Sequence, residues 1–134
     1  MIRQISIFAE NKKGSLSTLT GILKDENINI EAMIINDSGE YGIIRMLVDD
    51  PERTYDILKG KGYLVHGDSV YAVDMQDTPG SLNGLLSDIS AAGVNVDYVY
   101  ISFSRSKANP IAVFHTEVAD GLEESLTWKG YKLL

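Results

Sequence analysis

Residues 10–16 and 76–82 each combine a polar side chain, a glycine and the expected start of a helix. The first segment reads Glu-Asn-Lys-Lys-Gly-Ser-Leu, and the second reads Gln-Asp-Thr-Pro-Gly-Ser-Leu. Glycine lets the backbone approach a ligand closely, and the helix start behind it offers unpaired N–H groups that suit a carboxylate. Asn11 or Asp77, three residues before each glycine, could contact an ammonium group. A zwitterionic amino acid needs both kinds of contact.

Helix capping explains the same pattern without a ligand. A polar residue followed by Gly and Ser is common before a helix, and Ser15 stands where an N-cap residue is expected. Residue types and spacing alone therefore leave a ligand-binding turn and an ordinary cap both open.

The two segments belong to an internal repeat. Residues 5–31 align with residues 71–97 at an offset of 66, and the offset becomes 68 further along the chain. The matched residues are Gly14-Ser15-Leu16 with Gly80-Ser81-Leu82, Leu19 with Leu85, Asn29 with Asn95, and Lys61-Gly62-Tyr63 with Lys129-Gly130-Tyr131. Matches in the same order over a whole half-chain predict a duplicated domain, with copies at 1–66 and 69–134.

Each copy reads as βαββαβ. In the first copy, the periodicity of the apolar residues and the positions of the turn residues predict four strands, at 2–9, 28–35, 41–48 and 63–65. They also predict helices at 15–27 and 50–60 and a hairpin turn at 36–39. In the second copy they predict strands at 69–76, 94–104, 110–118 and 130–134 and helices at 80–92 and 119–128. This order predicts an α+β, ferredoxin-like fold with an antiparallel sheet and both helices on one face. Only residues 66–68 separate the copies, so the two domains should touch.

The face of the sheet opposite the helices should be polar, but the sequence makes it apolar. Residues 32–35 are apolar at every position, and residues 98–101 carry tyrosines on one face. Ile43 and Leu47 add to the same side. A large apolar face needs a cover, so we expect sheets to stack in a homodimer or between the halves.

Composition argues against several classes of function. The chain has 12 Lys+Arg against 19 Asp+Glu and a net charge of −7, which disfavours nucleic acid and membrane surfaces as partners. It has no cysteine and no segment long and apolar enough for a membrane span, and a cytoplasmic location is the default expectation. Neither a catalytic constellation nor a metal or cofactor site is apparent, so we expect no enzyme activity.

The remaining notable side chains have ordinary explanations. His66 and His115 are too few for a metal site and fit surface or interface positions. Glu123-Glu124 reads as solvated charge at a helix start. Trp128 and Tyr131 are expected to pack in the core.

The segment Asn11-x-x-Gly14-Ser15-Leu16, followed by a helix and Asn27-Ile28-Asn29-Ile30, resembles the ACT domain, a small regulatory module of amino-acid metabolism. The second copy resembles this family even more closely, because it is similar to the family pattern D-x-P-G-x-L followed by G-V-N-I. The resemblance implies that two domains pair side by side, with an effector between the first turn of one domain and the start of the second strand of its neighbour. The ligand-binding residues implied are Asn11, Lys12, Gly14, Ser15, Leu16 and Asn29, and Asp77, Pro79, Gly80, Ser81, Leu82 and Asn95. In the first copy Lys13 stands where the family usually has a proline, which the second copy keeps as Pro79. The two turns therefore differ, and both sites need not bind a ligand.

The sequence thus predicts a tandem ACT protein that senses an amino acid. The resemblance implies regulation of a separate enzyme in trans, and we expect a homodimer without a cofactor. The alternative is a structural or partner-binding subunit that takes no ligand.

Overall fold

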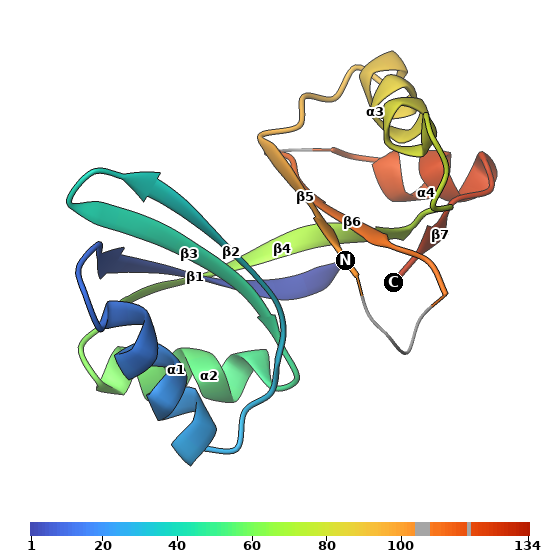
Figure 1. Cartoon of the computed structure of the whole chain (residues 1–134). Helices are drawn as coiled ribbons and strands as arrows, with labels where there is room; N and C mark the ends of the chain where they lie inside the picture. Colours follow the sequence, from blue (N-terminus) through green and yellow to red (C-terminus); the bar gives the residue numbers. More distant parts are fainter. Residues whose placement is uncertain (104–107, 118) are drawn as a thin grey trace. The chain divides into compact units, whose positions relative to one another are not determined.

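The computed structural model describes residues 1–103, 108–117 and 119–134, which form two βαββαβ units (Figure 1). The first copy holds β1 (Ile2–Glu10), α1 (Ser15–Asp25), β2 (Ile30–Ser38), β3 (Tyr41–Val48), α2 (Pro51–Gly60) and the start of β4 (Leu64–Asp74). The second copy holds the rest of β4, α3 (Ser81–Ala91), β5 (Tyr98–Ser102), β6 (Ile111–His115), α4 (Leu122–Trp128) and β7 (Lys132–Leu133). The predicted α+β fold with antiparallel sheets is confirmed.

The described chain divides into two compact units, residues 3–68 and residues 1–2 with 69–134. We call them the N-terminal and C-terminal units. The N-terminal unit has the strand order β2-β3-β1-β4, which makes β2 an edge strand. In the C-terminal unit β4 lies between β7 and β6, and β5 lies beyond β6.

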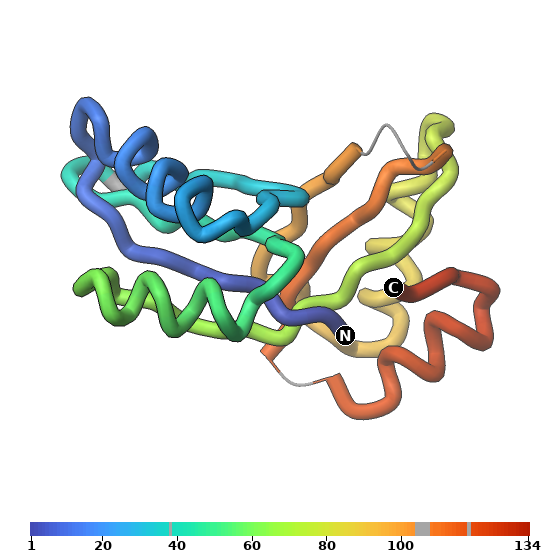
Figure 2. The backbone as a smooth tube through the Cα atoms, turned by 90° about the horizontal axis from the view of Figure 1, so that it is seen from below, coloured from blue at the N-terminus to red at the C-terminus, as the bar shows by residue number. Residues whose placement is uncertain are grey.

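One strand, β4, supplies both units. The sequence predicts separate strands at 63–65 and 69–76, whereas the structure has a single strand through Leu64–Asp74, which Figure 2 traces without interruption. Residues 66–68, which were expected to connect the two copies, lie within this strand. A Cβ on Gly67 would lie 2.5 Å from Arg3 Nη2, so the missing side chain leaves room for the arginine.

Both units are built on the same hydrophobic positions. In the N-terminal unit, α1 and α2 run alongside each other over one face of the sheet (Figure 2). The fully buried leucines and isoleucine of the helices match across the repeat: Leu19 with Leu85, Leu23 with Ile89, and Leu58 with Leu126. In the C-terminal unit Phe114 stacks on Tyr71, with ring centroids 5.0 Å apart.

Several predicted ends are wrong by a few residues. Strand β2 runs through Ser38, so that the hairpin turn lies at Gly39 and Glu40 instead of 36–39. Helix α4 begins at Leu122 instead of 119, because Gly121 takes a left-handed φ of 78° that ends the preceding turn. Strands β5 and β6 are shorter than the predicted 94–104 and 110–118, whose last residues fall outside the described residues.

The expectation that Trp128 packs in the core is wrong, since 91% of it is exposed. Leu122 and Leu126 occupy the inward face of α4, four residues apart. At 3.6 residues per turn, Trp128 follows Leu126 by about half a turn and so points away from the core. Tyr131 does pack against the core of its unit.

The C-terminal segment is held to α3 by Asp88. Tyr131 Oη donates to Asp88 Oδ2 at 2.7 Å, and Lys129 Nζ donates to Asp88 Oδ1 at 2.8 Å. The hydrogen bonds from Lys129 and Tyr131 lower the pKa of Asp88. Burial, together with the hydrogen bond to Asp88, raises the pKa of Tyr131 from 10.0 to about 12.

Replacing Tyr131 by phenylalanine should therefore lower the free energy of unfolding by on the order of 1 kcal/mol at neutral pH. Because the folded state raises the pKa of Tyr131, its contribution is present below pH 10.0 and is lost as the pH rises toward about 12. The difference between wild type and Tyr131→Phe in urea denaturation should shrink over that window. A difference that stays constant from pH 9 to 12 would show that this hydroxyl does not couple to folding.

Among the described residues, no helix is long and apolar enough to cross a membrane.

Candidate functional site

The turn between β1 and α1 is closed by a glycine. Gly14 is the N-cap residue of α1 with φ 88°, so the prediction of Ser15 as the N-cap is wrong. Glycine takes this position because a left-handed φ is costly for other residues. Gly80 occupies the same position before α3 with φ 89°. Because glycine has no side chain, neither cap residue can accept a hydrogen bond from the first N–H groups of its helix.

The first turn of α1 therefore has uncapped N–H groups. Ser15 N donates to Lys12 O and Thr18 N donates to Gly14 O. The N–H groups of Leu16 and Ser17 lie between them, in the turn where the helix itself supplies no acceptor. An anionic group placed there would receive two hydrogen bonds and the favourable end of the helix dipole.

Replacing Gly14 by alanine should lower the free energy of unfolding by about 1 kcal/mol or more, because alanine is strained at φ 88°. Gly21, inside α1, is the matched control. An added Cβ meets nothing within 4 Å at either position, so the two substitutions differ in backbone conformation and not in space. Gly21→Ala should raise stability by roughly 0.5–1 kcal/mol. Guanidinium denaturation of both variants tests this, and equal effects of the same sign would contradict it.

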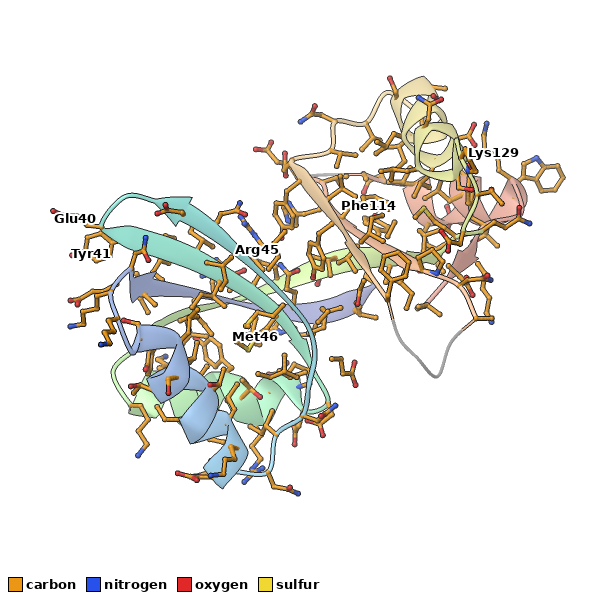
Figure 3. The ribbon with its side chains drawn as sticks, in the orientation of Figure 1. Glu40, Tyr41, Arg45, Met46, Phe114 and Lys129 are labelled. Atoms are coloured by element: carbon orange, nitrogen blue, oxygen red, sulfur yellow. The ribbon has the colours of Figure 1, made fainter. Side chains whose placement is uncertain are left out.

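Asn11 joins this turn to the β2–β3 hairpin. Its Nδ2 donates to Asp37 Oδ1 at 2.9 Å and to Gly39 O at 3.1 Å, and its backbone N donates to Glu40 O at 2.7 Å. Figure 3 shows Glu40 at the tip of that hairpin. The side-chain oxygen of Asn11 is not used in these bonds and remains a hydrogen-bond acceptor.

Lys12 is paired with its neighbour. Its Nζ lies 2.7 Å from Glu10 Oε2, and this hydrogen bond raises the pKa of Lys12. Both side chains are exposed. Lys12 would have to release Glu10 before it could bind a ligand carboxylate, so its part in the predicted site is secondary to the helix N–H groups.

A hollow of about 340 Å³ lies beside the turn. All the residues predicted in the first turn line it, namely Asn11, Lys12, Gly14, Ser15 and Leu16. The opposite wall is formed by residues that sequence reasoning missed: Ile35 and Asp37 of β2 and Gly42 and Ile44 of β3. Small-molecule pockets span roughly 300–1,000 Å³, so this hollow suits a small ligand.

A second hollow of about 640 Å³ meets the first at the turn. It shares Gly14 and Ser15 and adds Phe8, Tyr41 and Tyr63, which makes its wall more aromatic. The turn thus separates a small hollow beside β2 from a larger one beside the start of β4.

The smaller hollow borders an open edge of the sheet. Ile35 pairs with Ile44 and Met33 with Met46, so both lie on the face that carries the core. Ile35 and Met33 are nevertheless 41% exposed, and Leu16 is 40% exposed. Because β2 is the edge strand, nothing in the N-terminal unit covers these side chains beyond it.

Asn29 and Asn95 are not brought to the turns of their own units. Strands β1 and β2 both run antiparallel to β3, so the start of β2 lies at the opposite end of the sheet from the end of β1. Nine residues of β2 separate Asn29 from the turn by about 30 Å. Asn29 N donates to Asp49 Oδ1, and Asn95 Nδ2 donates to Asp97 Oδ1. Either asparagine could reach such a turn only in a neighbouring domain.

The turn before α3 holds the ligand-binding residues that were predicted for the C-terminal unit. Asp77, Pro79 and Gly80 are exposed, and Ser81 shares a hydrogen bond of 2.8 Å with Thr78 between their hydroxyl groups. Leu82 is half-buried against the core, unlike Leu16. The two turns have the same backbone but differ in what surrounds them.

The histidines lie apart from both turns. His115 Nδ1 lies 2.7 Å from Asp97 Oδ2, and its ring stacks on Tyr98 at 5.4 Å. Over residues 1–103, 108–117 and 119–134 there is no group of three or more side chains that could hold a metal ion.

Comparison with known proteins finds the same architecture. A family model described as an ACT domain pair matches residues 1–133. The crystal structure of protein BT0572 from Bacteroides thetaiotaomicron is similar at a TM-score of 0.90 and 35% identity, over 98% of this chain and 90% of that one. The ligand-free regulatory subunit of aspartate kinase from Thermus thermophilus has a TM-score of 0.70 at 15% identity, over 93% and 88% of the two chains. A structure of aspartokinase alpha and beta subunits has a TM-score of 0.63 at 21% identity, over 92% and 88%. No curated protein sequence matches the chain.

Proposed function

Because the chain belongs to the ACT family as a pair of ACT domains, we propose that it is a regulatory protein that binds a free amino acid and has no enzyme activity of its own. The observation that carries the proposal is the 340 Å³ hollow, which is lined both by residues of the uncapped start of α1 and by Asp37. Donors for a carboxylate and an acceptor for an ammonium group thus border one small space.

In the proposed complex, the ligand carboxylate accepts from the N–H groups of Leu16 and Ser17. The ligand ammonium group donates to Asp37, with Asn11 Oδ1 as a second acceptor. Leu16 and Ile35 contact the ligand side chain, which favours an apolar one.

We propose that a neighbouring domain completes this site along the open edge of β2. Antiparallel pairing of β2 with the β2 of a second copy would set the start of one strand beside the end of the other. The partner's Asn29 would then approach the turn, and Met33 and Ile35 would be covered. This edge-to-edge pairing is the side-by-side arrangement that the resemblance implies, and it differs from the stacking of sheets that the apolar outer face led us to expect.

The proposal is tested by thermal unfolding in the presence of each of the twenty amino acids. A ligand that binds only the folded chain stabilises it by RT ln(1 + [L]/Kd), about 2.7 kcal/mol at a hundredfold excess over Kd. At least one amino acid should raise the melting temperature in a saturable way. If none does so at millimolar concentration, the alternative of a ligand-free partner-binding subunit is favoured.

A further inference from the structure

The outward face of α4 carries the most exposed aromatic side chain of the described residues. Trp128 is 91% exposed and lines a hollow of about 560 Å³ with Glu123, Glu124 and Thr127. Thr127 Oγ1 donates to Glu123 O, one helical turn earlier, so these residues form one face of the helix. This face therefore presents a large aromatic ring beside two carboxylates, which is a combination that suits a cation.

The fold does not require these residues. At the repeat offset of 68, Trp128 corresponds to Gly60 of α2, and Glu123 and Thr127 correspond to Tyr55 and Lys59. On α2, Lys59 Nζ lies 5.6 Å from the centre of the Tyr55 ring, so that helix pairs its aromatic residue with its own cation. The inward leucine is kept in both helices, as Leu58 and Leu126, while none of the outward residues of α4 is kept in α2.

Acidic side chains predominate around this face, since Asp120 lies just before Glu123 and Glu124. Glu123 already forms an ion pair with a cation, because its Oε1 lies 3.3 Å from the ammonium group of Met1. Burial raises the pKa of Tyr71, and the charges of Glu123 and Asp120 raise it further. Lys129, the nearest lysine in the sequence, is held by Asp88.

We propose that the outward face of α4 is a docking site for a cationic segment of a partner protein. An arginine or lysine of that segment would lie over the indole of Trp128, where a cation–π contact forms, and would pair with the carboxylates of Glu123 and Glu124. Tryptophan is among the residues that dominate the energy of protein interfaces. This docking site rests on the proposed function in one respect, namely that a regulatory protein acts on a separate partner protein.

The test uses the full chain and the fluorescence of Trp128, which is the only tryptophan of the sequence. Titration with tetra-arginine amide should change the emission in a saturable way, and tetra-glutamate should not. The double variant Glu123→Gln and Glu124→Gln should weaken this binding about fivefold or more. About 1 M salt, which shortens the Debye length to about 3 Å, should also weaken it.

The matched control is the double variant Glu52→Gln and Asp56→Asn, which removes the same charge from α2. It should bind the peptide as wild type does. Equal weakening by both double variants would show nonspecific attraction to an acidic chain and would overturn the proposal. An emission that shifts with protein concentration alone would overturn it too, because the occupant would then be a second copy. Amino-acid binding by the α4 variant should be unchanged, which separates this test from that of the proposed function.

Discussion

Replacing Asp37 by asparagine should weaken amino-acid binding at the N-terminal turn about 10- to 100-fold. The substitution removes the negative charge that would face the ligand ammonium group in the proposed complex but keeps Oδ1 as an acceptor. The hydrogen bonds from Asn11 Nδ2 and Gly39 N to Oδ1 can therefore persist, and the hairpin should keep its shape. A hydrogen bond to a charged group contributes roughly 1.5–3 kcal/mol, which corresponds to this loss of affinity.

Asp25→Asn is the matched control, because it removes the same charge from the exposed far end of α1. Isothermal titration should give the wild-type Kd for Asp25→Asn and a raised Kd for Asp37→Asn, with both melting temperatures close to wild type. An unchanged Kd in Asp37→Asn would remove Asp37 from the ligand site.

Replacing Met33 by lysine should break the proposed association through the β2 edge and raise the dissociation constant of the proposed homodimer at least about tenfold. A lysine on an edge strand opposes pairing with another strand, and two-fold symmetry would bring two such lysines together. Met33 is 41% exposed in the single chain, so the substitution should leave its fold intact.

Leu64→Lys is the control for this change, because Leu64 is 68% exposed but lies on β4, away from the β2 edge. Sedimentation velocity should report dimers for wild type and Leu64→Lys and monomers for Met33→Lys. Dimers in all three would mean that the chain associates through another surface.

The elements of the fold follow from local patterns, and their ends do not. Helical spacing from Leu19 to Leu23 and alternation along β1 predict the repeating unit. In the structure β1 is more deeply buried than its alternation indicates, since residues 4–7 are buried on both faces. The continuity of β4 could not be predicted in this way. Residues 66–68 resemble a connection between the copies, and only the structure shows Arg3 beside Gly67, where a side chain would stand.

Half of the candidate site was accessible from the sequence. Gly14 and its neighbours share one turn, so spacing alone brings them together. Asp37 lies more than twenty residues away and reaches the site because β2 and β3 fold back beside β1. The bond between Asn11 and Asp37 is long-range, and no local pattern predicts it. The outward position of Trp128 was also missed, since a tryptophan near the end of a short helix reads as core until the helix start is known.

Isothermal titration of the wild-type chain with each of the twenty amino acids tests the central proposal most directly. We expect at least one amino acid to bind with a saturable heat, with a Kd raised by Asp37→Asn and unaffected by Asp25→Asn. If none of the twenty gives a saturable heat at millimolar concentration, the chain is not an amino-acid sensor.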